Sequence, residues 1–219
     1  MPLSSRKRSL LTWLPAAILV VVIGLVVLTT FAVQESWWAE ESPAASADQK
    51  ASDGSSMLTD AGFDYVNVEG IVRVRIGDGS LPADELGMGA DDEKSAEFRR
   101  PVRAVIAGGD DVYVLDDVAS LTAVTRAGEL ASVTLTYDNP GAWPDAVDRV
   151  RSLAATFGWE AAQIDALDGQ LSDFNRDGGE DAFTAQVGPS GGGARVTATL
   201  FYDAASGITP VTLTFEPAQ

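Results

Sequence analysis

The segment Leu130–Phe157, LASVTLTYDNPGAWPDAVDRVRSLAATF, combines the two periodicities that decide the fold class. Residues 130–137 alternate between apolar and polar side chains, which is the pattern of a β-strand with one buried face. Ser132, Thr134 and Thr136 occupy the opposite face and predict that this side of the sheet meets water. A turn comes next, with the sequence Asp-Asn-Pro-Gly.

The second half of the segment predicts an amphipathic helix over residues 144–157. Pro144 suits the first helical turn, where its missing N–H leaves no hydrogen bond unmade. Apolar residues then recur every three or four positions on one face, namely Val147, Val150, Leu153, Ala154 and Phe157. Gly158 comes directly after them, and glycine is the residue type that most often ends a helix.

Further strands are expected on both sides of this segment. Short apolar or alternating runs predict strands at 72–76, 102–107, 112–115, 121–125, 183–187, 196–202 and 211–215. The turn around residues 127–129 is expected to form a hairpin. Residues 80–100 are expected to form mostly an exposed loop, with a short helix near 91–99.

A second helix with a weaker apolar pattern is expected over residues 160–172. Its inner face would consist of Ala161, Ile164, Leu167 and Leu171. The elements together predict an α+β domain, in which a mainly antiparallel sheet is covered by one or two helices.

Two of the expected strands resemble each other. The runs Gly128–Asp138 and Gly193–Asp203 share Gly, Thr, Leu, Tyr and Asp at corresponding places. Their C-terminal neighbours differ, because a helix is expected after the first run and a strand after the second. We interpret the similarity as a shared strand design, with internal duplication as the alternative.

The N-terminal part of the chain predicts a transmembrane helix over Leu10–Val33. These 24 residues carry no charge and are apolar on every face. As a helix they would extend about 36 Å, which exceeds the roughly 30 Å of a bilayer core. Trp13, Trp37 and Trp38 lie near its ends, where indole rings favour the headgroup region. A cleaved signal peptide is the alternative, although its apolar run would be shorter.

The charges on either side of this helix predict its orientation. Arg6, Lys7 and Arg8 precede it, whereas the first charged residues after it are acidic. The positive-inside rule therefore predicts a cytoplasmic N-terminus. The predicted organisation is a basic N-terminus (1–9), a transmembrane helix (10–33), a flexible acidic linker (34–57) and an extracytoplasmic domain (58–219) of a single-pass protein in the cell membrane.

The composition excludes several classes of function. The chain has neither cysteine nor histidine, so disulfides, Ser-His-Asp triads and zinc sites of thiolate or imidazole are impossible. All 32 acidic residues lie after residue 33, against 12 of the 15 basic ones. Such an acidic domain should repel nucleic acid and other polyanions. The abundance of Ala and Gly, with Arg favoured over Lys, indicates a bacterial source.

The most specific local pattern is a candidate calcium loop at residues 173–181. The first six residues satisfy D-x-N-x-D-G, so that Asp173, Asn175, Asp177 and Asp181 would supply oxygen ligands. Thr184 stands where such a loop usually has a bidentate Glu. The alternative is a polar loop between a helix and a strand, whose Asp, Asn and Gly favour turns.

Paired carboxylates are the remaining catalytic option. A glycosidase-type hydrolase needs two carboxyl groups in one cleft. Adjacent or nearby acids are frequent, and the candidates are Asp84-Glu85, Asp110-Asp111, Asp116-Asp117, Asp165 and Asp168. Lys94-Ser95 lacks the features of a Ser-Lys dyad.

Two further groups are candidates for binding sites. Arg99, Arg100 and Arg103 form a basic cluster that is expected to pair with the domain's own acids rather than with an anionic partner. Trp143 and Trp159 flank the helix at 144–157 and are expected to fasten it to the sheet rather than to stack on a ligand.

The sequence therefore favours a non-catalytic binding or scaffolding module of the cell envelope. It would contact the bilayer through Leu10–Val33 and another envelope protein through its outer domain, with no required cofactor. A small envelope hydrolase that uses paired carboxylates is the alternative.

Overall fold

The computed structural model describes residues 54–138, 140–179, 181–189 and 192–218. The predicted N-terminus 1–9, the predicted membrane helix Leu10–Val33 and nearly all of the linker 34–57 lie outside these residues. Within the described ranges, no helix is both long enough and apolar enough to cross a membrane.

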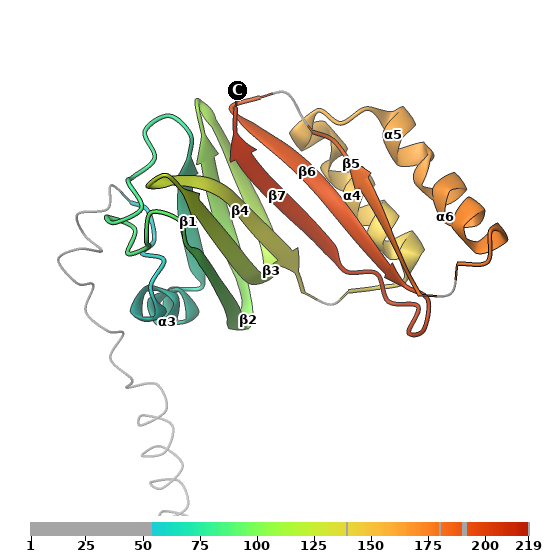
Figure 1. The fold of residues 1–219 in the computed structure, drawn as a ribbon, viewed down its shortest axis with the longest axis horizontal. Coiled ribbons are helices and arrows are strands. Elements are labelled where there is room, and N and C mark those ends of the chain that lie inside the picture. The colour runs from blue at the N-terminus through green and yellow to red at the C-terminus, as the bar shows by residue number, and fades with distance from the viewer. Residues whose placement is uncertain (1–53, 139, 180, 190–191, 219) are drawn as a thin grey trace, which may run out of the picture. The chain divides into compact units, whose positions relative to one another are not determined.

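The described part of the chain is an α+β domain with a seven-stranded mixed sheet (Figure 1). The strands are β1 (Ile71–Ile76), β2 (Glu93–Gly108), β3 (Asp111–Arg126), β4 (Glu129–Tyr137), β5 (Ala182–Val187), β6 (Ala194–Asp203) and β7 (Val211–Pro217). They lie in the order β1-β2-β3-β4-β7-β6-β5. Only β1 and β2 are parallel, and every other neighbouring pair is antiparallel. The predicted fold class and mainly antiparallel sheet are confirmed.

Helices lie at both ends of this sheet. They are α3 (Asp60–Glu69), α4 (Trp143–Phe157), α5 (Ala161–Asp165) and α6 (Leu167–Arg176). Helix α3 packs against β1 and β2, α4 against β6, and α6 against β5. In Figure 1, α4 lies behind β5 and β6, and no described element crosses the near face of β4, β7 and β6.

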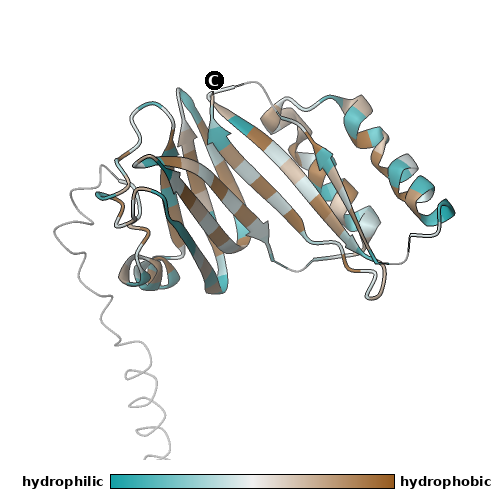
Figure 2. Cartoon of the chain, viewed as in Figure 1, coloured by the Kyte–Doolittle hydropathy of each residue, from teal (hydrophilic) through white to brown (hydrophobic). Residues whose placement is uncertain are grey.

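The hydrophobic core lies on one face of the sheet because the strands alternate. In β7, Val211, Leu213 and Phe215 are buried, whereas Thr212 and Thr214 lie on the opposite face. Figure 2 shows the same alternation as brown and pale bands along β6 and β7. Burial of a side chain such as that of Phe215 contributes about 1.5–3 kcal/mol to stability.

Strand β2 corrects the expectation for residues 80–100. The predicted loop and short helix near 91–99 are wrong from Glu93 onward, because these residues pair with the second half of β3. The alternation is hard to see in the sequence because Glu93, Ser95 and Glu97 point to solvent. Ala96 and Phe98 on the other side are only partly buried.

Strand β3 joins two runs that the sequence pattern separates. The predicted strands 112–115 and 121–125 are both confirmed, as parts of one 16-residue strand. Between them the pairing with β4 shifts register after Val118, and Asp117 takes a positive φ of 61°. Asp tolerates this conformation better than most residues, so the strand bends without ending.

Helix α3 is an element that the sequence pattern does not predict. It begins after Thr59, whose Oγ1 accepts a hydrogen bond from the Gly62 N–H at 3.1 Å, and ends at Gly70 with a φ of 79°. Its sequence shows little helical periodicity, and Phe63 and Val66 are the two large side chains that it buries.

The start of the domain also lies earlier than residue 58. The Ser56 N–H donates to the carbonyl oxygen of Arg73 at 2.7 Å, and the Arg73 N–H donates to Ser56 Oγ at 3.0 Å. Leu58 is fully buried. The last residues of the predicted linker 34–57 therefore belong to the domain.

Helix α4 confirms the prediction for 144–157 to within one residue. Pro144 lies in the first turn, and Gly158 ends the helix with a φ of 66° and donates its N–H to the Ala154 carbonyl. Phe157 anchors the C-terminal end, because its ring lies 4.8 Å from Trp159, 5.2 Å from Tyr113 and 5.9 Å from Phe215, measured between centroids.

The second predicted helix is longer than the sequence pattern indicates, and it is interrupted. The pattern predicts residues 160–172, whereas α5 and α6 together extend to Arg176. Ile164 and Leu167 are buried as predicted, and Leu171 is partly buried, but Ala161 is exposed.

Candidate functional site

The open face of the sheet carries hydroxyl side chains in two rows that cross neighbouring strands. We call these residues the hydroxyl face: Ser95, Thr122, Thr134, Thr214 and Thr197 in one row, and Ser120, Thr136, Thr212 and Thr199 in the other. Thr199 is buried, and the others are exposed or partly exposed. Neighbouring strands are about 4.8 Å apart, and alternate residues of a strand are about 7 Å apart. The hydroxyl groups therefore form a regular polar grid.

Hydrogen bonds between strands and the packed core beneath the sheet both hold the hydroxyl face in place. Ser95 Oγ and Thr122 Oγ1 lie 2.8 Å apart, and the hydroxyl oxygens of Thr134 and Thr214 lie 3.0 Å apart. Behind them, residues such as Leu135 and Leu213 are almost fully buried in the core. A grid on paired strands over a packed core keeps its side-chain positions better than one on a loop.

A small cavity opens between the end of β4 and the first turns of α4. It has a volume of about 220 Å³, and we call it the α4 cavity. Tyr137, Asp138, Asp145, Arg149 and Thr209 contribute to its lining. These residues come from β4, α4 and the segment before β7, so the cavity exists only in the folded chain.

Two of the lining residues form a stacked pair. The guanidinium carbon of Arg149 lies 4.5 Å from the centroid of the Tyr137 ring. Burial raises the pKa of Tyr137 to about 12; nearby Asp117 and Asp116 add to this rise, and Arg149 opposes it. The phenol is therefore protonated at neutral pH and is able to donate a hydrogen bond.

Thr209 differs from the other buried polar residues of the domain. Its side chain is 1% exposed, and its N–H donates to the Gly141 carbonyl at 2.8 Å. Its Oγ1, however, has no hydrogen-bond partner among the described residues. A buried hydroxyl without a partner is costly, and such groups are uncommon in folded proteins.

A larger cavity of about 850 Å³ is lined by acids at the end of the sheet near the β2–β3 turn. Asp78, Asp110, Asp111 and Glu129 contribute carboxylates, and all four are exposed. Asp111 has a structural contact, because its Oδ2 accepts from the Gly193 N–H at 2.9 Å. Within the described residues, no three acidic side chains are close enough together to hold a metal ion.

The predicted calcium-loop residues lie partly on a helix. Asp173 and Asn175 belong to α6, Asp177 comes after its last residue, and Asp181 lies just before β5. Helical residues two apart point to different sides, so Asp173 and Asn175 do not converge as in a calcium loop. Asp173 instead contacts Arg176, with Oδ1 and Nη1 2.7 Å apart. Calcium binding by these residues is a prediction from the sequence, and the helical placement of Asp173 and Asn175 argues against it.

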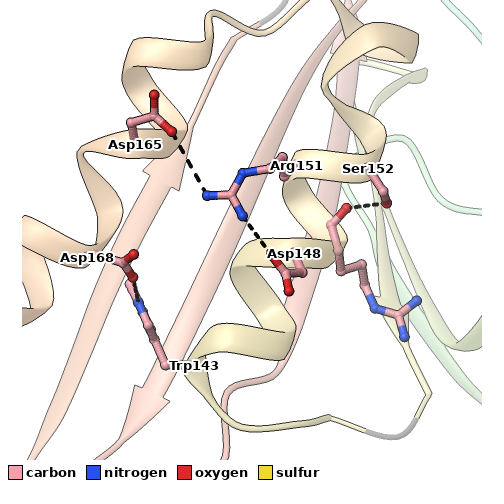
Figure 3. Close-up of polar contacts among 7 residues, drawn as sticks. Trp143, Asp148, Arg151, Ser152, Asp165 and Asp168 are labelled. Atoms are coloured by element: carbon pink, nitrogen blue, oxygen red, sulfur yellow. Dashed lines mark hydrogen bonds and ion pairs between the residues drawn. The ribbon is translucent and has the colours of Figure 1, made fainter.

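Two of the candidate acids join α4 to the next two helices. Figure 3 shows Arg151 between Asp148 and Asp165, with N–O distances of 2.6 and 3.9 Å. It also shows Asp168 Oδ1 accepting from Trp143 Nε1 at 2.9 Å. Asp165 and Asp168 therefore have contacts that position α5 and α6.

The other predicted pairs remain apart or make local contacts. Asp84 and Glu85 are exposed. Asp116 Oδ1 lies 2.7 Å from Arg103 Nε, and this contact raises the pKa of the arginine. Lys94 and Ser95 are neighbours in β2 and point to opposite faces, which rules out a dyad between them.

Two of the three arginines of the basic cluster pair with acids as expected, and the tryptophans pack as expected. Arg99 pairs with Asp64 at 3.4 Å, and Arg103 pairs with Asp116. The third member, Arg100, donates to the Val68 carbonyl at 3.0 Å. Trp143 and Trp159 are both buried, and Trp159 Nε1 donates to the Val196 carbonyl at 3.1 Å. Their predicted packing role is confirmed.

The α4 cavity has no signal in the sequence. Tyr137, Arg149 and Thr209 are separated by up to 72 positions, and each fits a common structural pattern on its own. The inward-facing position of Tyr137 is predictable from strand alternation, but its neighbours are not.

The chain matches no protein-family model, and no curated protein or solved structure shows significant similarity to it. The functional proposal below therefore depends on the sequence and on the geometry of the domain.

Proposed function

We propose that the chain is a membrane-anchored, non-catalytic binding module of the bacterial cell envelope. The uncharged segment Leu10–Val33 supports an anchor in the bilayer. The basic residues before it and the acidic residues after it support display of the α+β domain outside the membrane. The acidic linker supports a domain held at some distance from the bilayer.

The hydroxyl face is the observation that carries the binding role. A hydroxyl group both donates and accepts hydrogen bonds, so the grid suits an uncharged polar surface of an envelope protein. The chain's net charge of −17 disfavours polyanions as partners.

Site-specific photo-cross-linking of the full-length chain in membranes tests this role. A benzophenone side chain would replace Thr134 or Thr212 on the hydroxyl face, or Ser172 on the exposed side of α6 as the control. We expect one discrete product from both face positions and none from Ser172. Equal labelling from all three positions, or no product from the face, would contradict the proposal.

One observation favours an envelope hydrolase as the second candidate. Asp110 and Asp111, a pair expected from the sequence, line the 850 Å³ cavity together with Asp78 and Glu129. This candidate predicts cleavage of an envelope glycan that is lost in Asp110→Asn and retained in Asp84→Asn, whose carboxylate lies outside the cavity lining. Equal activity in both variants would exclude it.

A further inference from the structure

Apolar side chains are exposed on the outer surface of β2 and β3, close to the turn that joins the two strands. Val112 is 62% exposed and Val114 is 53% exposed, the two largest values among the exposed large apolar residues that the structure describes. The register places Val105 beside Val114 and Ala107 beside Val112, and both neighbours are partly exposed. We call these four residues the valine patch. Exposed apolar residues that adjoin one another indicate a contact site, whereas scattered single ones are normal.

The valine patch differs from the other outward-facing positions of the sheet. Farther along β3 these positions hold Ser120 and Thr122, and the hydroxyl face continues from them across β4, β7 and β6. Hydroxyl groups bond well with water, whereas Val112 and Val114 gain from leaving it. The patch is therefore better suited to a covering partner than to solvent.

Arginine side chains border the valine patch on one side. The parallel register places Arg73 beside Val105 and Arg75 beside Ala107. Arg103 lies on the same face, because it comes two residues before Val105 in β2. The patch thus has an apolar part on β2 and β3 and a basic border toward β1.

Nearby acids offset this basic border only in part. Arg73 Nη1 lies 2.9 Å from Glu69 Oε1, and Arg103 Nε lies 2.7 Å from Asp116 Oδ1. Both ion pairs are partly or fully exposed, and such pairs contribute little to stability. The acidic turn 110–111 lies at the opposite end of the patch, next to Val112. Positive charge is therefore confined to the side of the patch toward β1.

The chain enters the domain on this same side. Gly54, the first described residue, lines a small cavity together with Arg73. The Ser56 N–H donates to the Arg73 carbonyl oxygen at 2.7 Å. Residues 39–53 span up to about 50 Å when extended, whereas β3 lies two strands from β1, about 10 Å away. The predicted linker before Gly54 is therefore long enough to reach all of the patch.

We propose that the linker segment Trp37–Glu41 covers the valine patch. Its sequence, Trp-Trp-Ala-Glu-Glu, holds the only aromatic residues between positions 34 and 53, directly before two acids. The indole rings would pack on the valines, since tryptophan offers a large apolar area. Glu40 and Glu41 would face the arginines, whose guanidinium groups pair well with carboxylates. Attachment to the same chain favours this contact by raising the local concentration of the segment.

Covering the patch in this way would shorten the tether of the domain. Residues 34–36 alone would separate the docked segment from the predicted membrane helix Leu10–Val33, so the domain would lie close to the bilayer. Release of the segment would let the whole linker extend. Indole rings also favour lipid headgroups, so the bilayer is the competing contact for Trp37 and Trp38.

Disulfide trapping tests the contact, because the chain has no cysteine of its own. One cysteine replaces Ala39, in the middle of the segment, and the second replaces Ala107, in the patch. The matched control pair is Ala39→Cys with Thr122→Cys, since Thr122 also faces outward and is partly exposed but lies outside the patch. Both full-length variants are oxidised in detergent and in membranes, and an intramolecular disulfide is detected by its faster migration without reductant.

We expect the Ala39→Cys/Ala107→Cys pair to form its disulfide roughly tenfold faster than the control pair, or more, because docking brings the two thiols together. Replacing Trp37 and Trp38 by serine should lower the rate to that of the control. Val112→Ser combined with Val114→Ser should do the same without lowering the unfolding temperature, because both side chains are exposed.

Equal rates for the two cysteine pairs would overturn the proposal. So would a disulfide that joins two chains, because it would assign the patch to a second copy. Protection of the Ala107→Cys thiol from a water-soluble maleimide in membranes, retained after both tryptophans are replaced, would assign the patch to lipid and also overturn it. None of these outcomes bears on the hydroxyl face, because cross-linking from Thr134 and Thr212 tests that role separately.

Discussion

Tyr137 illustrates how single residues in this domain combine structural and chemical roles. Its ring is buried on the inner face of β4 and stacks against the Arg149 guanidinium, and the residue lines the α4 cavity. Because burial disfavours the phenolate and so raises the pKa, folding keeps the proton on Tyr137 well beyond the pH at which a free tyrosine loses it.

This raised pKa predicts a loss of stability at alkaline pH. The unfolded chain releases the Tyr137 proton near pH 10, whereas the folded chain holds it until about pH 12. The contribution is fully present below pH 10 and falls by roughly 2–3 kcal/mol as the pH rises through the folded pKa. Urea unfolding of wild type and Tyr137→Phe between pH 9 and pH 12 measures it. The two proteins should diverge above pH 10, and parallel curves would contradict the assignment.

Asp177 provides a second prediction at the scale of single residues. The helical placement of Asp173 and Asn175 leaves no converging oxygen set, so millimolar calcium should not change the unfolding temperature. Asp177→Ala should respond to calcium as the wild type does. A rise in the wild type that is absent from the variant would restore the calcium loop that the sequence pattern allows.

At the level of elements, α4 is the helix that the sequence defines most clearly, and it contributes more buried residues than the other described helices. Its periodic apolar face, Pro144 and Gly158 all agree, so its bounds are predictable to within one residue. Helix α3 and the first half of β2 are not predictable, because α3 lacks a clear helical period and residues 93–97 contain a single apolar residue, Ala96. Both depend on tertiary partners: α3 packs on β1 and β2, and residues 93–97 depend on pairing with β3.

The contacts of Phe157 predict a large effect of its removal. Its ring touches Tyr113, Trp159 and Phe215, so Phe157→Ala should leave a cavity and lower the free energy of unfolding by about 3–5 kcal/mol. Thr156→Ala, one position earlier on the exposed side, should change it by no more than about 0.5 kcal/mol. Denaturant unfolding checks both. A small effect at Phe157 would show that these ring contacts do not anchor the end of α4 to the core.

At the level of the whole molecule, the strand order explains why part of the fold has no signal in the sequence. Strands β4 and β6 have similar sequences and both pair with β7, the last strand of the chain. Their resemblance therefore matches a shared environment, with β7 on one edge and the core behind. This insertion of β7 also aligns the hydroxyl rows and leads the chain through Thr209 to the cavity. No local pattern encodes such an alignment.

Display of the domain outside the membrane by an N-terminal anchor is the central claim about the whole molecule. Protease treatment of spheroplasts that carry the full-length chain, with an epitope tag at each end, tests it most directly. We predict that external protease removes the C-terminal tag from the membrane fraction and cleaves within the linker, while the N-terminal tag stays protected. A C-terminal tag that remains protected until the membrane is broken, or a chain recovered outside the membrane fraction, would contradict this topology.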